Sequence, residues 1–313
     1  SLENKIINIK PDLIILPTKA SDTYYFDLKK ISDKHKIDLL YLIDNWDNVS
    51  AKSVIFSNQY YGVWGQQSYE QVKKIHKISL KSIFILGSPR FENFFRLRDT
   101  SIKRHYKNKY ILFLENTYPR EIISLKFLDK IVNTFKNFND YKIIYRPHPW
   151  RKSKELIKIK NYKNVIIDKQ LSQAYKKKDF SFKSQPDLNY YPSLIKNAEF
   201  IIAGPTTMVI ESLIFRKKIL LLAFKESSHP YSPHNLYKLY EHFKGINKFK
   251  NIFLNKSLNN LEKAIKRLYF KKKLNYNYID TYRNYFLYRD KKGYKLRLSK
   301  IIDKIINNKN VQK

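Results

Sequence analysis

The sequence contains no cysteine. This absence excludes disulfides, thiolate metal sites and cysteine nucleophiles, and it is compatible with a reducing cytoplasm. Long apolar runs are also missing: no window approaches about 18 uninterrupted apolar residues, so we expect no transmembrane helix. Residues 1–5 are predicted to be a polar, strand-like start without a signal peptide. Because the chain lacks an initiator methionine and reaches an apolar strand soon after Pro11, we expect a trimmed chain or a fragment.

Glycine and acidic residues are also scarce. Six glycines occur in 313 residues, and 27 Asp and Glu stand against 62 Lys and Arg, which gives a formal net charge of +35. Such an excess normally indicates nucleic acid or an anionic membrane as partner. Here Lys, Asn, Ile and Tyr are abundant along the whole chain, as an AT-rich genome would produce, so we treat the excess as compositional. A basic surface still suits a peripheral enzyme that acts at an anionic bilayer or on nucleotide-activated substrates.

Length and hydrophobic content favour two domains. A chain of 313 residues with 43% hydrophobic residues can bury one large core or two medium ones. Short apolar runs alternate with amphipathic stretches, which is the pattern of parallel α/β folds. We predict strands at residues 13–16, 37–43, 83–86, 110–114, 141–145, 165–167, 200–203 and 219–224, and a strand end near residue 65. We predict helices at residues 24–34, 66–76, 120–138, 189–197, 236–243 and 258–270.

Two stretches lack apolar periodicity. The charged residues 96–109 are predicted to be a linker, and the polar residues 171–187 a loop. The domain boundaries follow from the first of these stretches. We predict a Rossmann-like domain over residues 1–100, a second one over 101–255, and a basic helical tail over 256–313 that packs against either domain.

Residues 199–224 read as strand, tight turn, helix and strand. The apolar run 200–203 ends at Gly204, and the turn presents Thr206 and Thr207 ahead of a helix with Glu211 in its first turns. Free N–H groups and the positive dipole end at a helix start favour a phosphate. We therefore predict a phosphate site at Thr206 and Thr207. The alternative is a plain N-cap in a Rossmann-like layer.

A second candidate follows the strand at 141–145, where the chain reads Arg146-Pro147-His148-Pro149. The two prolines restrict the backbone around His148 and prevent a helix there. His148 and Arg146 are therefore candidates for binding a nucleotide monophosphate or diphosphate. The alternative is a histidine with a structural role only.

Polar residues also follow the strand at 37–43. Asp44, Trp46, Asp47 and Asn48 lie where open α/β sheets bind ligands, and Asp44 or Asp47 is a candidate general base or partner of a sugar hydroxyl. The alternative is an Asx-turn cluster that leads out of the strand.

Secondary candidates lie in irregular segments. His229 and His234 occur in a Pro- and Ser-rich stretch directly after the strand at 219–224, and this stretch is predicted to fold over the Thr206 turn. Arg90 lies in a further turn before a helix, Gly87-Ser88-Pro89-Arg90-Phe91.

Taken together, the two βα series, the Arg-Pro-His-Pro segment and the turn and helix from Gly204 to Glu211 resemble GT-B glycosyltransferases of bacterial surface polysaccharide synthesis. The similarity extends to the Kdo transferases, the polysialyltransferases and the CDP-glycerol glycerophosphotransferases. These share a His-Pro motif and a Ser/Thr motif that grip a cytidine nucleotide. The segments around Trp46, Trp64 and Arg90 are similar to a pattern in surface-carbohydrate proteins of the same group, in which an Asp commonly replaces Glu92. The resemblance covers roughly residues 38–243.

The resemblance implies an α/β, GT-B-like fold: two Rossmann-like domains facing a cleft, a shortened N-terminal one on the acceptor side and a C-terminal one that binds the donor. It implies that His148 contacts the donor phosphate, that Thr206 and Thr207 bind phosphate oxygens, and that Glu211 accepts from the ribose hydroxyls. The donor-binding set is then Arg146, Gly204, Thr206, Thr207 and Glu211. The catalytic candidates are His148 and Asp47, with Asp44 second, and the candidate substrate-binding residues are Trp46, Asn48, Arg90, His229 and His234.

We therefore expect a metal-independent glycosyltransferase or glycerophosphotransferase without a cofactor. Its donor would be a nucleotide sugar or a CDP-polyol, and its acceptor a glycan or lipid-linked glycan of the capsule, lipopolysaccharide or another part of the cell envelope. The expected location is cytoplasmic, with peripheral contact at the inner face of an anionic membrane and no specific nucleic acid. Two alternatives remain open: an enzyme like UDP-N-acetylglucosamine epimerase, which would need further acidic residues, and a non-catalytic basic module that binds nucleic acid or membrane.

Overall fold

The computed structural model describes the chain except for residues 19–22, 53–54, 117–122, 149–155, 157–158, 160, 178–188, 226–228, 272–273 and 311–313. The chain divides into two compact units. Unit 1 comprises Ser1–Glu92 and Thr281–Lys313, and unit 2 comprises Asn93–Asp280. The division falls within α12 (Tyr276–Phe286), so part of the segment expected as a separate tail contributes to each unit.

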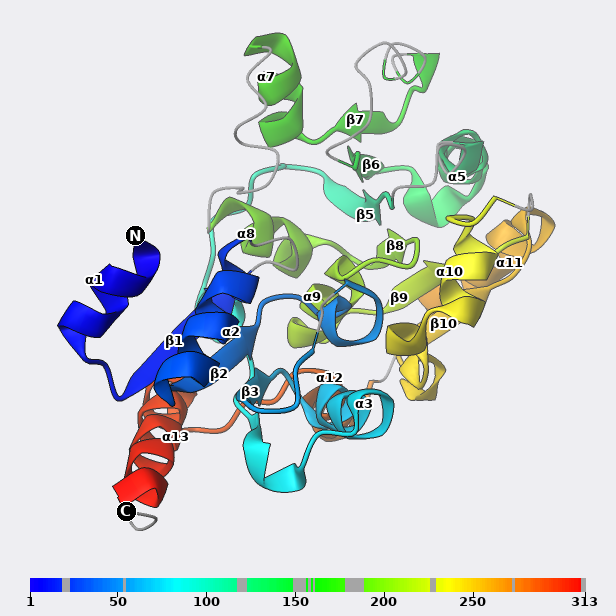
Figure 1. The fold of residues 1–313 in the computed structure, drawn as a ribbon. Helices are drawn as coiled ribbons and strands as arrows, with labels where there is room; N and C mark the ends of the chain where they lie inside the picture. The colour runs from blue at the N-terminus through cyan, green and yellow to red at the C-terminus, as the bar shows by residue number, and fades with distance from the viewer. Residues whose placement is uncertain are drawn as a thin grey trace. The chain divides into compact units, whose positions relative to one another are not determined.

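Unit 1 contains a parallel sheet of four strands in chain order (Figure 1). The strands are β1 (Leu13–Thr18), β2 (Asp38–Ile43), β3 (Tyr60–Val63) and β4 (Ile83–Ile85), and the helices between them are α2 (Tyr24–His35) and α3 (Gln66–His76). The predictions for these elements are confirmed. The predicted strand-like start is wrong: α1 (Leu2–Ile9) begins there because the Ser1 hydroxyl accepts the backbone N–H of Asn4 and caps the helix.

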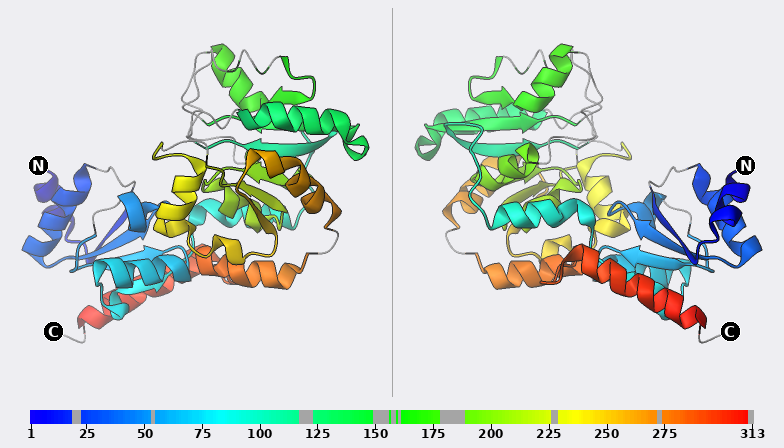
Figure 2. Two further views of the ribbon diagram at one scale, coloured as in Figure 1. Left: turned by 90° about the vertical axis from the view of Figure 1, so that its right-hand side faces the viewer. Right: turned by 90° about the vertical axis from the view of Figure 1, so that its left-hand side faces the viewer.

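The alternating side chains of β2 show how unit 1 builds its two layers. Leu40 packs on one face with Phe84 and with Ile305 of α13 (Gly293–Asn310), which lies along this face of the sheet (Figures 1 and 2). On the opposite face Tyr41 stacks on Tyr25 of α2, with ring centroids 4.9 Å apart. The C-terminal helix therefore completes the core of unit 1.

Unit 2 contains six parallel strands in the order β10-β9-β8-β5-β6-β7. Their bounds are β5 (Lys109–Leu114), β6 (Tyr141–Arg146), β7 (Val165–Ile167), β8 (Ile201–Ala203), β9 (Ile219–Leu222) and β10 (Ile252–Asn255). Numbered within the unit and read from β7, this is the order 3-2-1-4-5-6 of a Rossmann fold. The predicted strands of this half of the chain are confirmed.

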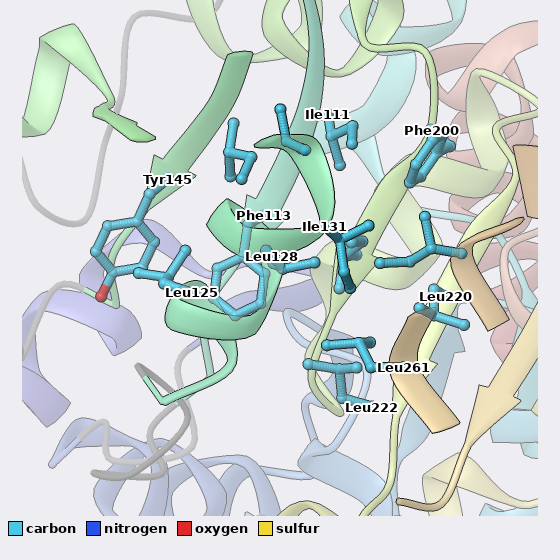
Figure 3. Close-up of a cluster of buried hydrophobic side chains, with 14 of the residues drawn as sticks. Ile111, Phe113, Leu125, Leu128, Ile131, Tyr145, Phe200, Leu220, Leu222 and Leu261 are labelled. Carbon is cyan, nitrogen blue, oxygen red and sulfur yellow. The ribbon is translucent and has the colours of Figure 1, made fainter. Parts of the chain in front are cut away.

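Helices cover both faces of the unit 2 sheet. On one face, α5 (Ile123–Thr134) and α11 (Leu261–Phe270) pack against the sheet, and Figure 3 shows Leu128 and Ile131 of α5 beside Phe113. On the other, α8 (Tyr190–Asn197) contacts β5 and α9 (Met208–Ile214) contacts β8. Burying each large apolar side chain contributes about 1.5–3 kcal/mol, so this two-sided core is the main source of stability of the unit.

Two predictions for unit 2 are wrong. The polar stretch 171–187 is predicted to be a loop, but α7 (Lys169–Lys177) occupies its start, and residues 178–187 lie outside the described part of the chain. The charged stretch 96–109 was expected to be a linker. It begins in α4 (Glu92–Arg98) and ends in β5, and the Lys196 ammonium of α8 binds the carbonyl oxygens of Leu97 and Arg98 at 3.0 and 2.9 Å. The charges of this stretch therefore do not mark a boundary, since its backbone is held on unit 2.

Candidate functional site

Three neighbouring strands of unit 2 end level with one another. In the sheet register Ala203 of β8 lies beside Leu114 of β5, which lies beside Arg146 of β6. The residues that follow them are Gly204 to Thr207, Glu115-Asn116 and Pro147-His148. Since adjacent strands are about 4.8 Å apart, the ends of β8 and β6 are separated by about 10 Å. The two motifs predicted from the sequence therefore lie at the same edge of one sheet.

This edge is also where the strand order reverses. From β5 the chain continues to β6 and β7 on one side, and β8 then returns to pair on the other side of β5. Loops that diverge from two adjacent strands in this way leave a crevice outside the carboxyl ends, which is the usual ligand position in open α/β sheets.

Glu115 is a site residue that sequence reasoning missed. Its side chain is fully buried, and its Oε2 accepts the backbone N–H of His148 at 2.9 Å, while its own N–H donates to the Arg146 carbonyl at 3.1 Å. The carboxylate therefore fixes the backbone that carries the imidazole. The available signal was a polar pair, Glu115-Asn116, directly after a buried strand, which is the same pattern that drew attention to Asp44 and Asp47.

Arg146, predicted to bind the donor, is buried at the end of β6. Its guanidinium pairs with the Asp168 carboxylate at 3.2 Å, donates to Gln170 Oε1 at 3.3 Å, and lies 4.6 Å from the ring centre of Tyr191. These contacts give Arg146 a supporting role beneath the His-Pro turn. Direct contact with a donor stays a prediction.

The Asp168 carboxylate, which pairs with Arg146, also accepts hydrogen bonds from neighbouring groups. Its Oδ1 accepts the backbone N–H of Leu171 at 3.2 Å, and its Oδ2 accepts the Tyr190 hydroxyl at 3.3 Å. The Tyr190 hydroxyl lies 3.3 Å from that of Tyr106. Burial raises the pKa of both tyrosines, and the Asp168 charge adds to the shift, so both phenols are neutral near pH 7. This network fastens β7 and α8 to the end of β6.

The turn after β8 carries the predicted phosphate site. Gly204 is buried, whereas Thr206 and Thr207 are half-buried. Thr207 occupies the N-cap position of α9 in a helical conformation, and its hydroxyl makes no capping hydrogen bond. The alternative in which this hydroxyl caps the helix is therefore not seen. Glu211 lies in the first turn of α9 with a side chain that is only 1% exposed.

The two secondary histidines lie around the start of α10 (Pro233–Leu239). His229 is exposed, and its Nδ1 accepts the backbone N–H of Tyr231 at 3.1 Å. His234 is half-buried in the first turn of the helix. Residues 226–228, through which this stretch was expected to reach the Thr206 turn, lie outside the described part of the chain, as does Pro149 after His148.

In unit 1, Asp44 is exposed after β2, and Asp47 is half-buried. Trp46 and Asn48 are buried. The Trp46 indole N–H donates to Gln67 Oε1 at 2.8 Å, so this tryptophan is part of the unit 1 core. Its role as a substrate-binding residue, and those of Asp44, Asp47 and Asn48, stay predictions.

Arg90 is exposed in a 3₁₀ turn, with its guanidinium 5.4 Å from the ring centre of Phe91. The buried counterpart in this part of unit 1 is Arg297, which donates to the Leu86 carbonyl at 2.9 Å and to Asp290 at 2.6 Å. The role of Arg90 as a substrate-binding residue stays a prediction.

Two further findings concern the described residues. They contain no group of three or more His, Asp or Glu side chains arranged to hold a metal ion. Within the same residues, no helix combines the length and the apolar character needed to cross a membrane.

Two parallel α/β units, one with Rossmann strand order, define a GT-B-like fold. No protein-family model matches the chain, and no curated protein matches its sequence. Solved structures do match. The UDP-GlcNAc 2-epimerase of Methanocaldococcus jannaschii is 17% identical, with a TM-score of 0.54, covering 87% of this chain and 74% of that one. S. aureus MnaA, solved with UDP, is 12% identical with a TM-score of 0.57, covering 99% and 77%. The glycotransferase of kitacinnamycin is 9% identical with a TM-score of 0.57, covering 97% and 78%.

Proposed function

We propose that this chain is a GT-B-type transferase that moves a sugar or polyol phosphate from a nucleotide-activated donor to a glycan hydroxyl. The observation that supports this most is the register of β8, β5 and β6, which brings the Thr206-Thr207 turn and His148 to one edge of unit 2 at the reversal of strand order. A nucleotide diphosphate suits this edge, because N–H groups and positive partial charge gather where strands feed helices.

Each residue has a distinct task in this proposal. The turn at Thr206 and Thr207 binds phosphate oxygens through backbone N–H groups and hydroxyls. His148, held by Glu115, donates to the leaving phosphate as its negative charge develops, and Glu211 accepts from the ribose. Preorganised donors of this kind stabilise the transition state because they need no rearrangement during the reaction.

The finer assignment rests on the sequence resemblance. His-Pro and Ser/Thr motifs of this order are similar to those of Kdo transferases, polysialyltransferases and CDP-glycerol glycerophosphotransferases, which favours a cytidine nucleotide and a cell-envelope acceptor such as capsule or lipopolysaccharide. The acceptor hydroxyl needs a base, and Asp47 is our first candidate, with Asp44 second.

A second function has support of its own. One of the matching solved structures is a UDP-GlcNAc 2-epimerase, and another is MnaA, which was solved with UDP. An epimerase needs acidic residues near the sugar, and Glu115 is an acidic residue at the strand ends that the sequence interpretation did not include. The substrate in this case would be UDP-GlcNAc.

A panel of CMP, CDP, UDP and GDP in thermal unfolding tests both functions. A ligand that binds only the folded chain at 100 times its Kd adds about 2.7 kcal/mol to the unfolding free energy. Stabilisation by CMP and CDP supports the transferase, and stabilisation by UDP supports the epimerase. A product assay with UDP-GlcNAc then separates 2-epimerisation from transfer. If no nucleotide stabilises the protein and RNA or anionic vesicles bind with steep salt dependence, the chain is a non-catalytic basic module.

A further inference from the structure

A groove of about 690 Å³ runs along β10 of unit 2. Its walls come from β10, from α11 beside it (Figure 1) and from residues 247–250. Among the described residues, six cationic side chains and no acidic one line it: Lys248, Lys250, Lys256, Lys263, Arg267 and Lys271. An uncompensated row of this kind attracts an anionic ligand, and its concave shape strengthens the local potential.

A buried amide in the groove lacks a partner. Asn255, the last residue of β10, lines the groove and is 2% exposed, and its side-chain NH₂ has no hydrogen-bond partner among the described residues. An unsatisfied buried donor destabilises the folded chain, so an acceptor oxygen from a ligand would remove that penalty. Asn247 and Asn260 add further amides to the lining. Amides can bind hydroxyls and cations can bind negative charges, so this lining fits a ligand chain that carries both.

The groove reaches the carboxyl edge of the sheet. Asn255 pairs with Leu222, and Leu221 pairs with Ala203, so Asn255 is level with Gly204, the first residue of the Thr206 turn. β10 and β8 are two strand spacings apart, or about 10 Å. A ligand chain that lies along β10 therefore ends at the same sheet edge as the candidate site.

We propose that the groove binds an acidic oligosaccharide and that this oligosaccharide is the acceptor, the second statement resting on the proposed function. Nucleic acid fits less well because bases stack on open aromatic faces. Of the aromatic residues that line the groove, Phe249 is buried, Tyr237 is half-buried, and Phe253 has Lys271 and Arg267 at 4.8 and 5.9 Å from its ring centre. A flat membrane surface cannot enter a concave groove.

The test measures fluorescence anisotropy of a labelled oligogalacturonate, a sugar chain with one carboxylate per unit, without any nucleotide donor. Competitors are a neutral dextran oligomer, a single-stranded DNA of equal charge and phosphatidylglycerol vesicles. K263Q and R267Q each remove one exposed groove cation, and we expect each to weaken binding about 2- to 5-fold at low salt. The matched control is K266Q on the same helix, since Lys266 pairs with Glu262 at 2.6 Å and does not line the groove.

The proposal is supported if oligogalacturonate binds more tightly than dextran and DNA, and if K266Q binds like the parent protein. It is overturned if K266Q weakens binding as much as K263Q, or if the DNA or the vesicles displace the oligosaccharide at lower concentration. N255A should also weaken binding about 3- to 10-fold without lowering the thermal midpoint; a lower midpoint with unchanged binding would make Asn255 purely structural. If the protein binds the oligosaccharide but shows no transfer activity, the proposed function is refuted and the groove assignment still holds.

Discussion

The backbone N–H of His148 donates to the Glu115 carboxylate across 2.9 Å, which fastens the turn after β6 to the end of β5. The two residues are 33 positions apart in the sequence, and only the pairing of their strands brings them together. Glu115 is therefore a positioning residue in our proposal. It does not need to touch the substrate, because it sets where the imidazole lies.

Replacing Glu115 tests this role. E115A leaves the His148 N–H without its buried acceptor, so we expect the unfolding free energy to fall by about 1–3 kcal/mol. E115Q keeps an acceptor oxygen at the same position and should lose less. Chemical denaturation measures stability, and the kcat/KM of both variants measures positioning. Equal losses of activity in E115A and E115Q would show that the negative charge, not the hydrogen bond, is what matters.

His148 is the sharpest test of the chemistry. H148A removes only the half-buried imidazole and keeps the backbone N–H that Glu115 binds. We expect transfer to fall by about 100- to 1,000-fold, the usual effect of losing one preorganised donor, while the thermal midpoint stays unchanged. The measurement is initial-rate transfer from the donor that the nucleotide panel identifies. Unchanged turnover would remove His148 from the mechanism.

Much of the fold was predictable because strands of parallel sheets are buried on both faces and read as continuous apolar runs. β7 and α3 match their predicted ranges, and β8 begins one residue later than predicted. The helix α7 was missed because, among its described side chains, only Leu171 is buried, which leaves a weak apolar period. The helix α1 was missed because its signal is a single cap, the Ser1 hydroxyl.

The site was predictable only in part. The His148 and Thr206 segments each carry a local signature, a proline-flanked histidine and a strand-to-helix turn. The residues that connect them do not. Glu115 and Asp168 are ordinary acidic residues after apolar strands, and their partners are set by the order β8-β5-β6-β7, which arises from tertiary packing.

The ion pair between Asp168 and Arg146 leads us to predict a loss of unfolding free energy when the pair is broken. Both side chains are almost fully buried, at 0% and 5% exposure. D168A leaves a buried guanidinium without its carboxylate, and breaking such a pair from one side costs about 3–5 kcal/mol. D168N keeps the shape of the side chain and one of its two acceptor oxygens, so it should cost less. Urea denaturation of the two variants gives the comparison, and a loss below about 1 kcal/mol for D168A would contradict a supporting role for this pair.

For the Thr206-Thr207 turn we predict the opposite outcome: a substitution there weakens nucleotide binding without a loss of stability. The Thr207 hydroxyl makes no capping hydrogen bond, so T207A should change the unfolding free energy by no more than about 0.5 kcal/mol. Nucleotide affinity should fall about 3- to 10-fold, because one hydrogen bond to a charged phosphate is lost. Isothermal titration with the best nucleotide measures this, and T206A provides the neighbouring comparison. Unchanged affinity in both variants would place the phosphate elsewhere.

The buried Lys217 leads to a prediction of how the unfolding free energy depends on pH. Burial lowers the pKa of this lysine from 10.5 to about 8, and its ammonium donates to the Ala198 carbonyl at 2.5 Å. Between about pH 8 and pH 10 the unfolded chain keeps a proton on Lys217 that the folded chain has released, so the contribution of Lys217 to the unfolding free energy rises with pH in this window. Above pH 10 the buried tyrosines act in the other direction, since burial raises the pKa of Tyr25 to about 12 and the unfolded phenol ionises first.

Burial also lowers the pKa of the neighbouring Lys218, so thermal midpoints measured from about pH 8 to pH 10 isolate Lys217 only when a variant is compared with the parent protein. K217M cannot titrate, so its midpoint should rise less across this window than that of the parent protein, even though the variant also loses the bond to Ala198. K225M is the control, since Lys225 is exposed after β9 of the same unit, and it should keep the parent slope. Equal slopes in K217M and the parent would mean that Lys217 stays protonated in the folded chain and that its burial is relieved by solvent.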